Sequence, residues 1–150
     1  MNNIIDMFTN YVLWCAALGW VTAQVLKVVI TLILRRKLNL KLLFASGGMP
    51  SSHSATVCAL ATAIGKVSGF GSVEFALSFV FAFIVMYDAS GVRRAAGEQA
   101  KVINKLVRSI EHGDKLEMQK ELKELIGHTP LEVMAGAALG VIIGIMFITV

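Results

Sequence analysis

The segment from Tyr11 to Leu34, YVLWCAALGWVTAQVLKVVITLIL, is almost continuously apolar and decides the fold class. A helix needs about 20 apolar residues to cross the hydrocarbon core of a bilayer, so this segment is long enough to span it. Gln24 and Lys27 interrupt the run, and with Trp20 and Thr31 they share one helix face. We expect that face to point into the protein, away from lipid.

The composition of the whole chain agrees with a membrane protein. Hydrophobic residues make up 56% of the 150 residues, and the mean hydropathy of +0.71 is too high for an ordinary soluble domain. Three further apolar runs cover about 53–70, 73–91 and 131–149. Gly136, Gly140 and Gly144 recur every four residues along the last run, which predicts close helix packing. We therefore expect one domain over residues 1–150, an all-α integral membrane bundle of about four transmembrane helices. A charged segment with helical patterning, 92–128, adds a cytoplasmic helical part.

The distribution of charge predicts the orientation of this bundle. Of the 14 Lys and Arg residues, 12 fall in 35–52 and 92–128. The positive-inside rule places both segments in the cytoplasm, so four spans leave both termini outside in a multi-pass protein of the cell membrane. The net charge of +4 fits an anionic membrane face or a phosphorylated substrate better than nucleic acid, because no basic patch alternates with exposed aromatic residues.

The loop 47–55, GGMPSSHSA, joins the basic turn to the second apolar run. Gly48 and the glycine before it free the backbone, and Pro50 is expected to set the first turn of the next helix. Ser51, Ser52 and His53 then lie where helix N–H groups lack intrahelical partners, which favours a bound anion. We expect this loop to hold a phosphate, with His53 taking part in its chemistry. A serine cap beside a structural histidine is the simpler alternative.

A second histidine, His128, directly precedes the fourth apolar run. Glu132 lies four residues later, where its carboxylate can hydrogen-bond the imidazole and fix its tautomer. Thr129 and Glu132 also form a capping box, with proline at the first helical position, and the two interpretations are compatible. Because His53 and His128 both lie at the cytoplasmic ends of membrane helices, we expect them to converge.

Charged side chains near these histidines are further candidates for the site. Lys27 lies inside a span, where a cation is costly unless it has a function or reaches the interface. Arg93 and Arg94 follow the third span, either as phosphate ligands or as ordinary flanking charges. Asp88 is expected to pair with one of these three cations, and Gln24 to support the site.

Together these groups predict phosphoryl transfer. Cations and helix amides neutralise the charge on the phosphate oxygens, while one histidine attacks phosphorus and another protonates the leaving oxygen. No carboxylate cluster typical of metal ligands is evident in the sequence, so we expect no metal and no cofactor.

These motifs resemble the type-2 phosphatidic acid phosphatase (PAP2) superfamily, which includes the vanadium haloperoxidases. The loop 47–55 is similar to its second motif, and HTPLEV at 128–133, followed by Gly136, is similar to its third. The stretch 87–97, YDASGVRRAAG, resembles the divergent branch of that superfamily, small membrane proteins of four to five helices. The resemblance covers about residues 20–145.

The resemblance implies an all-helical, metal-independent phosphatase of the acid phosphatase type. It implies that His128 is the nucleophile that forms a phosphohistidine, that Glu132 orients it, and that His53 is the general acid. It also implies three phosphate-binding residues: Lys27, Ser51 and Ser52.

The sequence departs from the superfamily pattern in three places. The arginine-proline pair expected after Lys27 is absent, and so is the arginine expected upstream of His128. We expect Arg93 or Arg94 to supply that charge. Glu132 replaces the usual aspartate and is longer by one methylene.

The expected function is therefore hydrolysis of a lipid or prenyl (di)phosphate at the cytoplasmic membrane face. One alternative is a non-catalytic membrane protein that binds or transports an anionic lipid. Another is a metal site formed by His53, His128, Asp88 and Glu132. Membrane lipids are the expected surroundings, and the sequence leaves the oligomeric state open, with a homodimer among the possibilities.

Overall fold

The computed structural model describes residues 2–36, 38, 42–43, 47–111 and 127–148. In these ranges the chain forms helices and no strands, which confirms the expected all-α fold. The helices are α1 (Asn2–Thr9), α2 (Tyr11–Arg35), α3 (Ser52–Ser68), α4 (Val73–Ser90), α5 (Val92–Glu111) and α6 (Pro130–Phe147). The part of the expected cytoplasmic segment at 112–126 lies outside the described residues.

Polar side chains directly before the long helices explain where those helices begin. The Asn10 side-chain oxygen accepts hydrogen bonds from the N–H groups of Val12 and Leu13 at 3.0 and 3.2 Å. Ser51 and Ser72 cap α3 and α4 in the same way. Each cap satisfies a backbone donor that has no partner within its helix.

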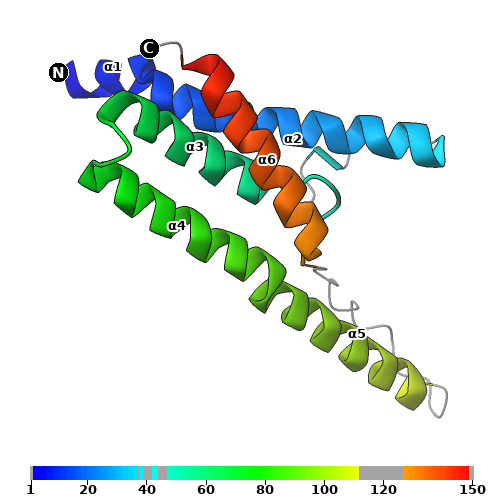
Figure 1. The fold of residues 1–150 in the computed structure, drawn as a ribbon. Helices are drawn as coiled ribbons and strands as arrows, with labels where there is room; N and C mark the ends of the chain where they lie inside the picture. Colours follow the sequence, from blue (N-terminus) through cyan, green and yellow to red (C-terminus); the bar gives the residue numbers. More distant parts are fainter. Residues whose placement is uncertain (1, 37, 39–41, 44–46, 112–126, 149–150) are drawn as a thin grey trace.

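Helix α3 lies in the middle of the bundle and packs against α2, α4 and α6 (Figure 1). The helices α2, α3, α4 and α6 alternate in direction, and α5 continues from α4 beyond the rest of the bundle. The start of α1 and the end of α6 lie at the same end of the bundle. The loops that precede α3 and α6 therefore meet at the other end.

Small residues let the helices approach closely around α3. Ala55, Ala59 and Ala63 of α3 are fully buried. Three glycines of α6, predicted from the sequence as a packing ladder, face α3: Gly136, Gly140 and Gly144. A Cβ added at Gly140 would overlap the carbonyl oxygen of Ala55, and one at Gly144 would lie 2.6 Å from the Cβ of Thr62. The predicted close packing is confirmed.

Three helical stretches are long and apolar enough to cross a membrane: Tyr11–Arg35, Val73–Asn104, which joins α4 to most of α5, and Pro130–Phe147. The outward faces of these helices carry large apolar side chains, as expected for surfaces in contact with lipid. Helix α3, expected as a further span, has 17 residues and is not among the three, but it lies between them.

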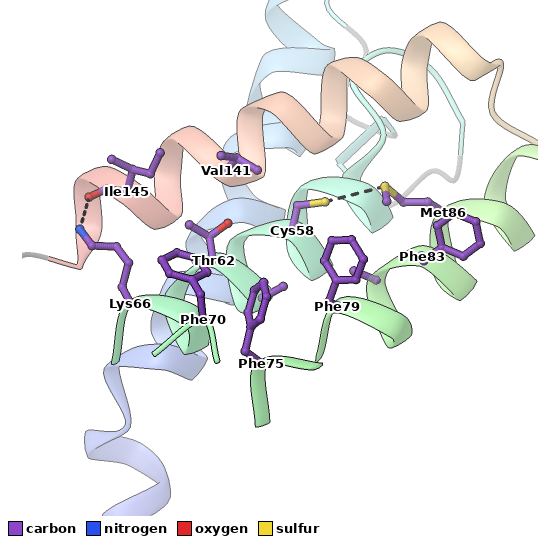
Figure 2. A pocket seen from close by; sticks show the side chains of 12 residues that line it. Cys58, Thr62, Lys66, Phe70, Phe75, Phe79, Phe83, Met86, Val141 and Ile145 are labelled. Atoms are coloured by element: carbon purple, nitrogen blue, oxygen red, sulfur yellow. Dashed lines mark hydrogen bonds between the residues drawn. The ribbon is translucent and has the colours of Figure 1, made fainter. Parts of the chain in front are cut away.

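An apolar groove of about 520 Å³ lies between α4 and α6, with α3 as its floor (Figure 2). Phe79 and Phe83 line one wall, and Val141 and Ile145 line the other. Near the end of the groove, the Lys66 ammonium donates hydrogen bonds to the carbonyl oxygens of Ile145, at 3.0 Å, and of Ile148. Lys66 therefore ties the end of α3 to the end of α6.

Close packing of α6 on α3 makes Gly140 sensitive to substitution. We expect Gly140→Ala to destabilise the protein by about 1–3 kcal/mol, because the added methyl group meets backbone and overpacks the interface. Thermal unfolding of the purified protein in detergent measures the change. Gly71→Ala is the matched control, since nothing lies within 4 Å of a Cβ at that position. Equal stability of the two variants would contradict the packing described here.

Candidate active site

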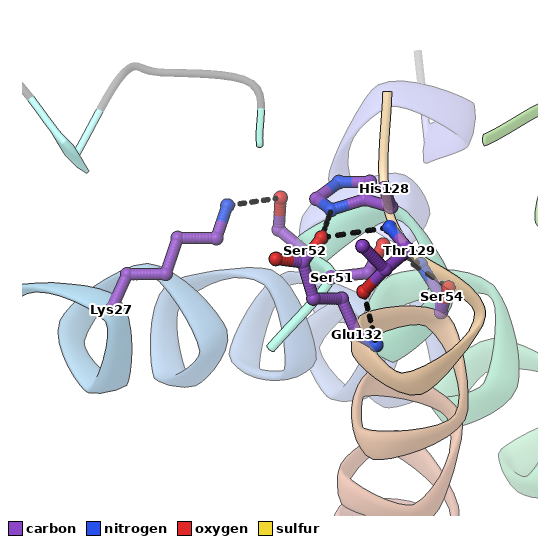
Figure 3. A network of polar contacts seen from close by, with 7 residues as sticks. All are labelled: Lys27, Ser51, Ser52, Ser54, His128, Thr129 and Glu132. Carbon is purple, nitrogen blue, oxygen red and sulfur yellow. Dashed lines mark hydrogen bonds and ion pairs between the residues drawn. The ribbon is translucent and has the colours of Figure 1, made fainter. Parts of the chain in front are cut away.

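His128 and Glu132 form the local pair that their spacing predicted (Figure 3). His128 Nδ1 lies 3.2 Å from Glu132 Oε2, and the histidine side chain is only 2% exposed. The same carboxylate oxygen accepts a hydrogen bond from the Thr129 N–H at 3.0 Å, while the Glu132 N–H donates to the Thr129 hydroxyl at 3.3 Å. The capping box and the contact to the imidazole therefore coexist.

This contact determines which nitrogen of His128 is available for chemistry. An ionised carboxylate has no proton to donate, so Nδ1 carries the proton and donates it to Glu132. Nε2 then keeps its lone pair. Figure 3 shows the imidazole above Glu132, beside the start of α3.

Two backbone hydrogen bonds connect the surroundings of His128 to neighbouring helices. The Ser51 N–H donates to the carbonyl oxygen of Glu132 at 3.0 Å, which ties the start of α3 to the first turn of α6. The His128 N–H donates to the carbonyl oxygen of Ala89 near the end of α4, also at 3.0 Å. His128 is thus held directly by α4 and α6, and its partner Glu132 is in turn bonded to the start of α3.

The loop before α3 differs from the sequence prediction in one respect. Ser51 is the N-cap, and its hydroxyl accepts from the N–H of Ser54 at 3.4 Å and from the Ser54 hydroxyl at 3.1 Å. Pro50, expected in the first helical turn, therefore lies before the cap, with a cis peptide bond between Met49 and Pro50. Gly48 has φ +83°, a conformation that glycine adopts without strain, which explains its place in the loop.

Lys27 is buried at the start of α3. Its side chain is 2% exposed, and Nζ donates a hydrogen bond to the Ser52 hydroxyl at 3.3 Å. Glu132 lies near enough for its charge to attract the ammonium. The alternative in which Lys27 reaches the membrane surface is therefore wrong. The face of α2 that was predicted to point inward is buried at Gln24 and Lys27, but Trp20 on the same face is 42% exposed, so the prediction is wrong there.

The two histidines meet as the sequence suggested. The rings of His53 and His128 lie edge to face with their centroids 5.9 Å apart. His53 is the second residue of α3, so its ring stands beside the helix start that also carries Ser52. The structure brings both imidazoles, Ser52 and Lys27 to one end of the bundle.

Gln24 and Asp88 take supporting positions around this cluster. The Gln24 side-chain amide donates a hydrogen bond to the carbonyl oxygen of Leu43 at 2.8 Å. This bond holds Leu43, which lies between α2 and α3, against α2. Asp88 is half-buried on α4 and lines a pocket together with His53.

The remaining basic residues near the site are described only in part. Arg35 is exposed at the end of α2. The side chains of Arg93 and Arg94 lie outside the described residues, as does His112. In the described ranges no group of three or more His, Cys, Asp or Glu is placed to hold a metal ion, including the set of His53, His128, Asp88 and Glu132. Cys15 and Cys58 are buried and form no disulfide.

The main feature that sequence reasoning missed is the backbone contact between Ser51 and Glu132. The one feature of the sequence that could have indicated this contact is Gly136, which lies one turn after Glu132. A Cβ at Gly136 would overlap the Ser51 carbonyl oxygen, so the glycine marks the place where the loop passes. Ser54 is fully buried, and its hydroxyl donates to the Ser51 hydroxyl, a contact that the sequence did not predict.

Comparisons with known proteins agree with the resemblance seen in the motifs. The family described as the Divergent PAP2 family matches residues 8–143. An uncharacterized membrane protein of Bacillus subtilis (strain 168), YuiD, is 45% identical in an alignment of 149 positions, and the match covers 93% of this chain and 94% of that protein. No solved structure matches the chain significantly. With nearly its whole length matched, the chain belongs to the Divergent PAP2 family.

Proposed function

We propose that this protein is a membrane phosphatase that hydrolyses a lipid or prenyl (di)phosphate through a phosphohistidine on His128. The observation that carries the proposal is the approach of His53 and His128, whose ring centroids lie 5.9 Å apart although about 75 residues separate them in the chain. One bound phosphate group can contact both rings at this distance. Membership of the Divergent PAP2 family supports the same chemistry.

The proposed reaction has two steps. Nε2 of His128 attacks phosphorus, the bond from phosphorus to the leaving oxygen breaks, and protonated His53 gives its proton to that oxygen. Water then attacks phosphorus, the phosphorus–nitrogen bond breaks, and His53 takes a proton from the water. Inorganic phosphate leaves, and both histidines return to their first state. Glu132 stabilises the His128 tautomer that this sequence needs.

The phosphate oxygens need positive partners during both steps. Lys27 and the Ser52 hydroxyl supply an ammonium group and a hydrogen-bond donor at the start of α3. The N-terminal end of α3 adds the positive end of the helix dipole. Ser51 contributes indirectly, because its hydroxyl is occupied as the helix cap. We propose that these groups form the phosphate cradle, which Arg93 or Arg94 completes.

The alternative of a non-catalytic binder or transporter of anionic lipid uses the same cations. Gln24, which that alternative places along a pathway, donates instead to the carbonyl oxygen of Leu43. Binding of an anionic lipid would also not require the Glu132 carboxylate to fix the tautomer of His128. We therefore favour catalysis, with the site facing the cytoplasm and both termini outside, as the distribution of Lys and Arg predicts.

The proposal predicts phosphate release that depends on both histidines and continues in excess EDTA. We expect His128→Asn to lower turnover by at least about a thousandfold and His53→Asn by about 10²–10⁴-fold. The assay measures inorganic phosphate released from farnesyl phosphate or phosphatidic acid by protein in lipid nanodiscs. His112→Asn is the matched control, because the sequence places that histidine in the charged segment away from the loops of the site. Unchanged turnover in folded His128→Asn protein would refute the mechanism, and binding without release would favour the alternative.

A covalent intermediate should accumulate when the general acid is removed. A good leaving group such as p-nitrophenolate needs no proton, so His53→Asn should still be phosphorylated by p-nitrophenyl phosphate but should hydrolyse the intermediate slowly. We expect a burst of p-nitrophenol and phosphate bound to the protein in an acid-labile, alkali-stable form. Mass spectrometry should place it on His128. Label on a serine would overturn the assignment of the nucleophile.

Lys27 should contribute to binding of the anion. We expect Lys27→Met to weaken binding of orthovanadate, an analogue of pentacoordinate phosphorus, by about 2 kcal/mol, or roughly thirtyfold in Kd. Titration calorimetry or inhibition of turnover measures the change. Lys66→Met is the matched control, since Lys66 also lies inside the bundle but binds carbonyl oxygens at its far end. Equal losses in both variants would show that Lys27 has no special role.

A further inference from the structure

A second pocket of about 550 Å³ lies beside His53, between α2, α3 and α4. Its inner wall includes Val57 of α3 and Ala89 of α4, both buried. Trp20 and Ile84 form its outer rim. His53 lines this pocket, and its ring also packs against that of His128, so the pocket adjoins the candidate active site.

The pocket leads from the site into the membrane-spanning part of the bundle. Along α4 its lining runs from Asp88 to Phe81, or roughly 10 Å at the helical rise of 1.5 Å per residue. Its rim faces outward, since Trp20 is 42% exposed and Ile84 is 58% exposed. An alkyl chain can therefore enter sideways from the bilayer while its headgroup stays beside His53.

We propose that this pocket receives the first part of the hydrocarbon chain of a single-chain alkyl or prenyl phosphate and selects such substrates over glycerolipid phosphates. The inference rests on the proposed function and adds a substrate class to it. The phosphate binds to Lys27 and Ser52, and His53 protonates the leaving oxygen. The hydrocarbon chain then lies along α4, from Asp88 toward Phe81.

The selectivity follows from the polar groups that line the pocket. The Thr56 hydroxyl already donates to the carbonyl oxygen of Ser52 at 2.7 Å, and an ionised Asp88 can only accept. Among the residues that line the pocket, the other side chain with an N–H group besides His53 is Trp20, whose indole lies at the rim. The ester carbonyl oxygens of a glycerolipid would need donors at this depth, and burying them without partners is unfavourable. A chain joined directly to the phosphate carries no such groups.

The groove between α4 and α6 in Figure 2 provides an internal comparison. Its volume of about 520 Å³ is close to that of the pocket, and its lining is also apolar. It contains neither His53 nor His128. A hydrocarbon bound only by apolar contacts would enter both the groove and the pocket. A substrate that is also held by its phosphate should enter the pocket beside His53.

The first experiment locates the chain without relying on catalysis. The variant Trp14→Phe leaves Trp20 as the only tryptophan, at the rim of the pocket. The probe is a non-hydrolysable alkyl phosphonate with bromine on the chain close to its headgroup, added to protein in nanodiscs of zwitterionic lipid. We expect a saturable loss of Trp20 emission that the unbrominated phosphonate reverses. The matched reporter is Phe83→Trp in a background of Trp14→Phe and Trp20→Phe, which places the tryptophan in the groove of Figure 2.

The outcomes separate this inference from the proposed function. Saturable quenching of Trp20 but not of Phe83→Trp supports the pocket, even if no phosphate is ever released. Equal quenching of the two reporters, or saturable quenching of Trp20 by phosphatidic acid brominated near its ester groups, overturns the inference while leaving a phosphatase possible.

A kinetic experiment tests selectivity with a matched pair of variants. Ile84→Trp narrows the pocket beside His53, and Ile145→Trp makes the same change on an exposed residue of the groove. We expect Ile84→Trp to lower kcat/KM for farnesyl phosphate by about tenfold and to leave that for phenyl phosphate unchanged, with no effect from Ile145→Trp. Equal losses for both substrates, or a wild-type preference for phosphatidic acid over farnesyl phosphate, would refute the substrate class.

Discussion

The hydrogen bond from the Ser51 N–H to the carbonyl oxygen of Glu132 holds the start of α3 against the first turn of α6. It forms because Gly136, one turn further along α6, has no Cβ where the backbone of Ser51 passes. His53 follows Ser51 by two residues, and His128 precedes Glu132 by four, so this contact sets the distance between the two imidazoles. The geometry of the candidate site therefore depends on the packing of α6 against α3.

The features that the sequence predicted correctly are local or follow from strong physical costs. A helix places residues four apart on one face, so the contact between His128 and Glu132 and the capping box with Thr129 were visible in the spacing alone. Long apolar runs in the sequence predicted the helices α2, α3, α4 and α6. Burial of Lys27 followed from the cost of a cation in lipid, which favours an inward position. The glycine ladder of α6 predicted close packing, although it did not identify α3 as the partner.

The features that the sequence did not predict join residues that are far apart in the chain. No sequence pattern predicts the contact between Ser51 and Glu132, because their hydrogen bond joins backbone groups that do not depend on residue type. The pocket rimmed by Trp20 arises from three helices, and periodicity within one helix does not describe it. The role of Pro50 was wrong for a different reason. Proline at the first helical position and serine at the N-cap are both common starts, and the serine hydroxyl became the cap one residue later.

The two lysines inside the bundle show why one end of it favours an anion. Lys66 donates to carbonyl oxygens at the C-terminal end of α6, where the helix dipole is negative, so its charge is stabilised by the fold itself. Lys27 instead meets the N-terminal end of α3, where the dipole is positive, and its hydrogen-bond partner there is the neutral hydroxyl of Ser52. Glu132 offsets part of this positive charge, but its carboxylate is also engaged by His128 and by a backbone N–H. The remaining positive potential beside the two imidazoles is best balanced by an anion with several acceptor oxygens, and the phosphate group of the proposed substrate has this property.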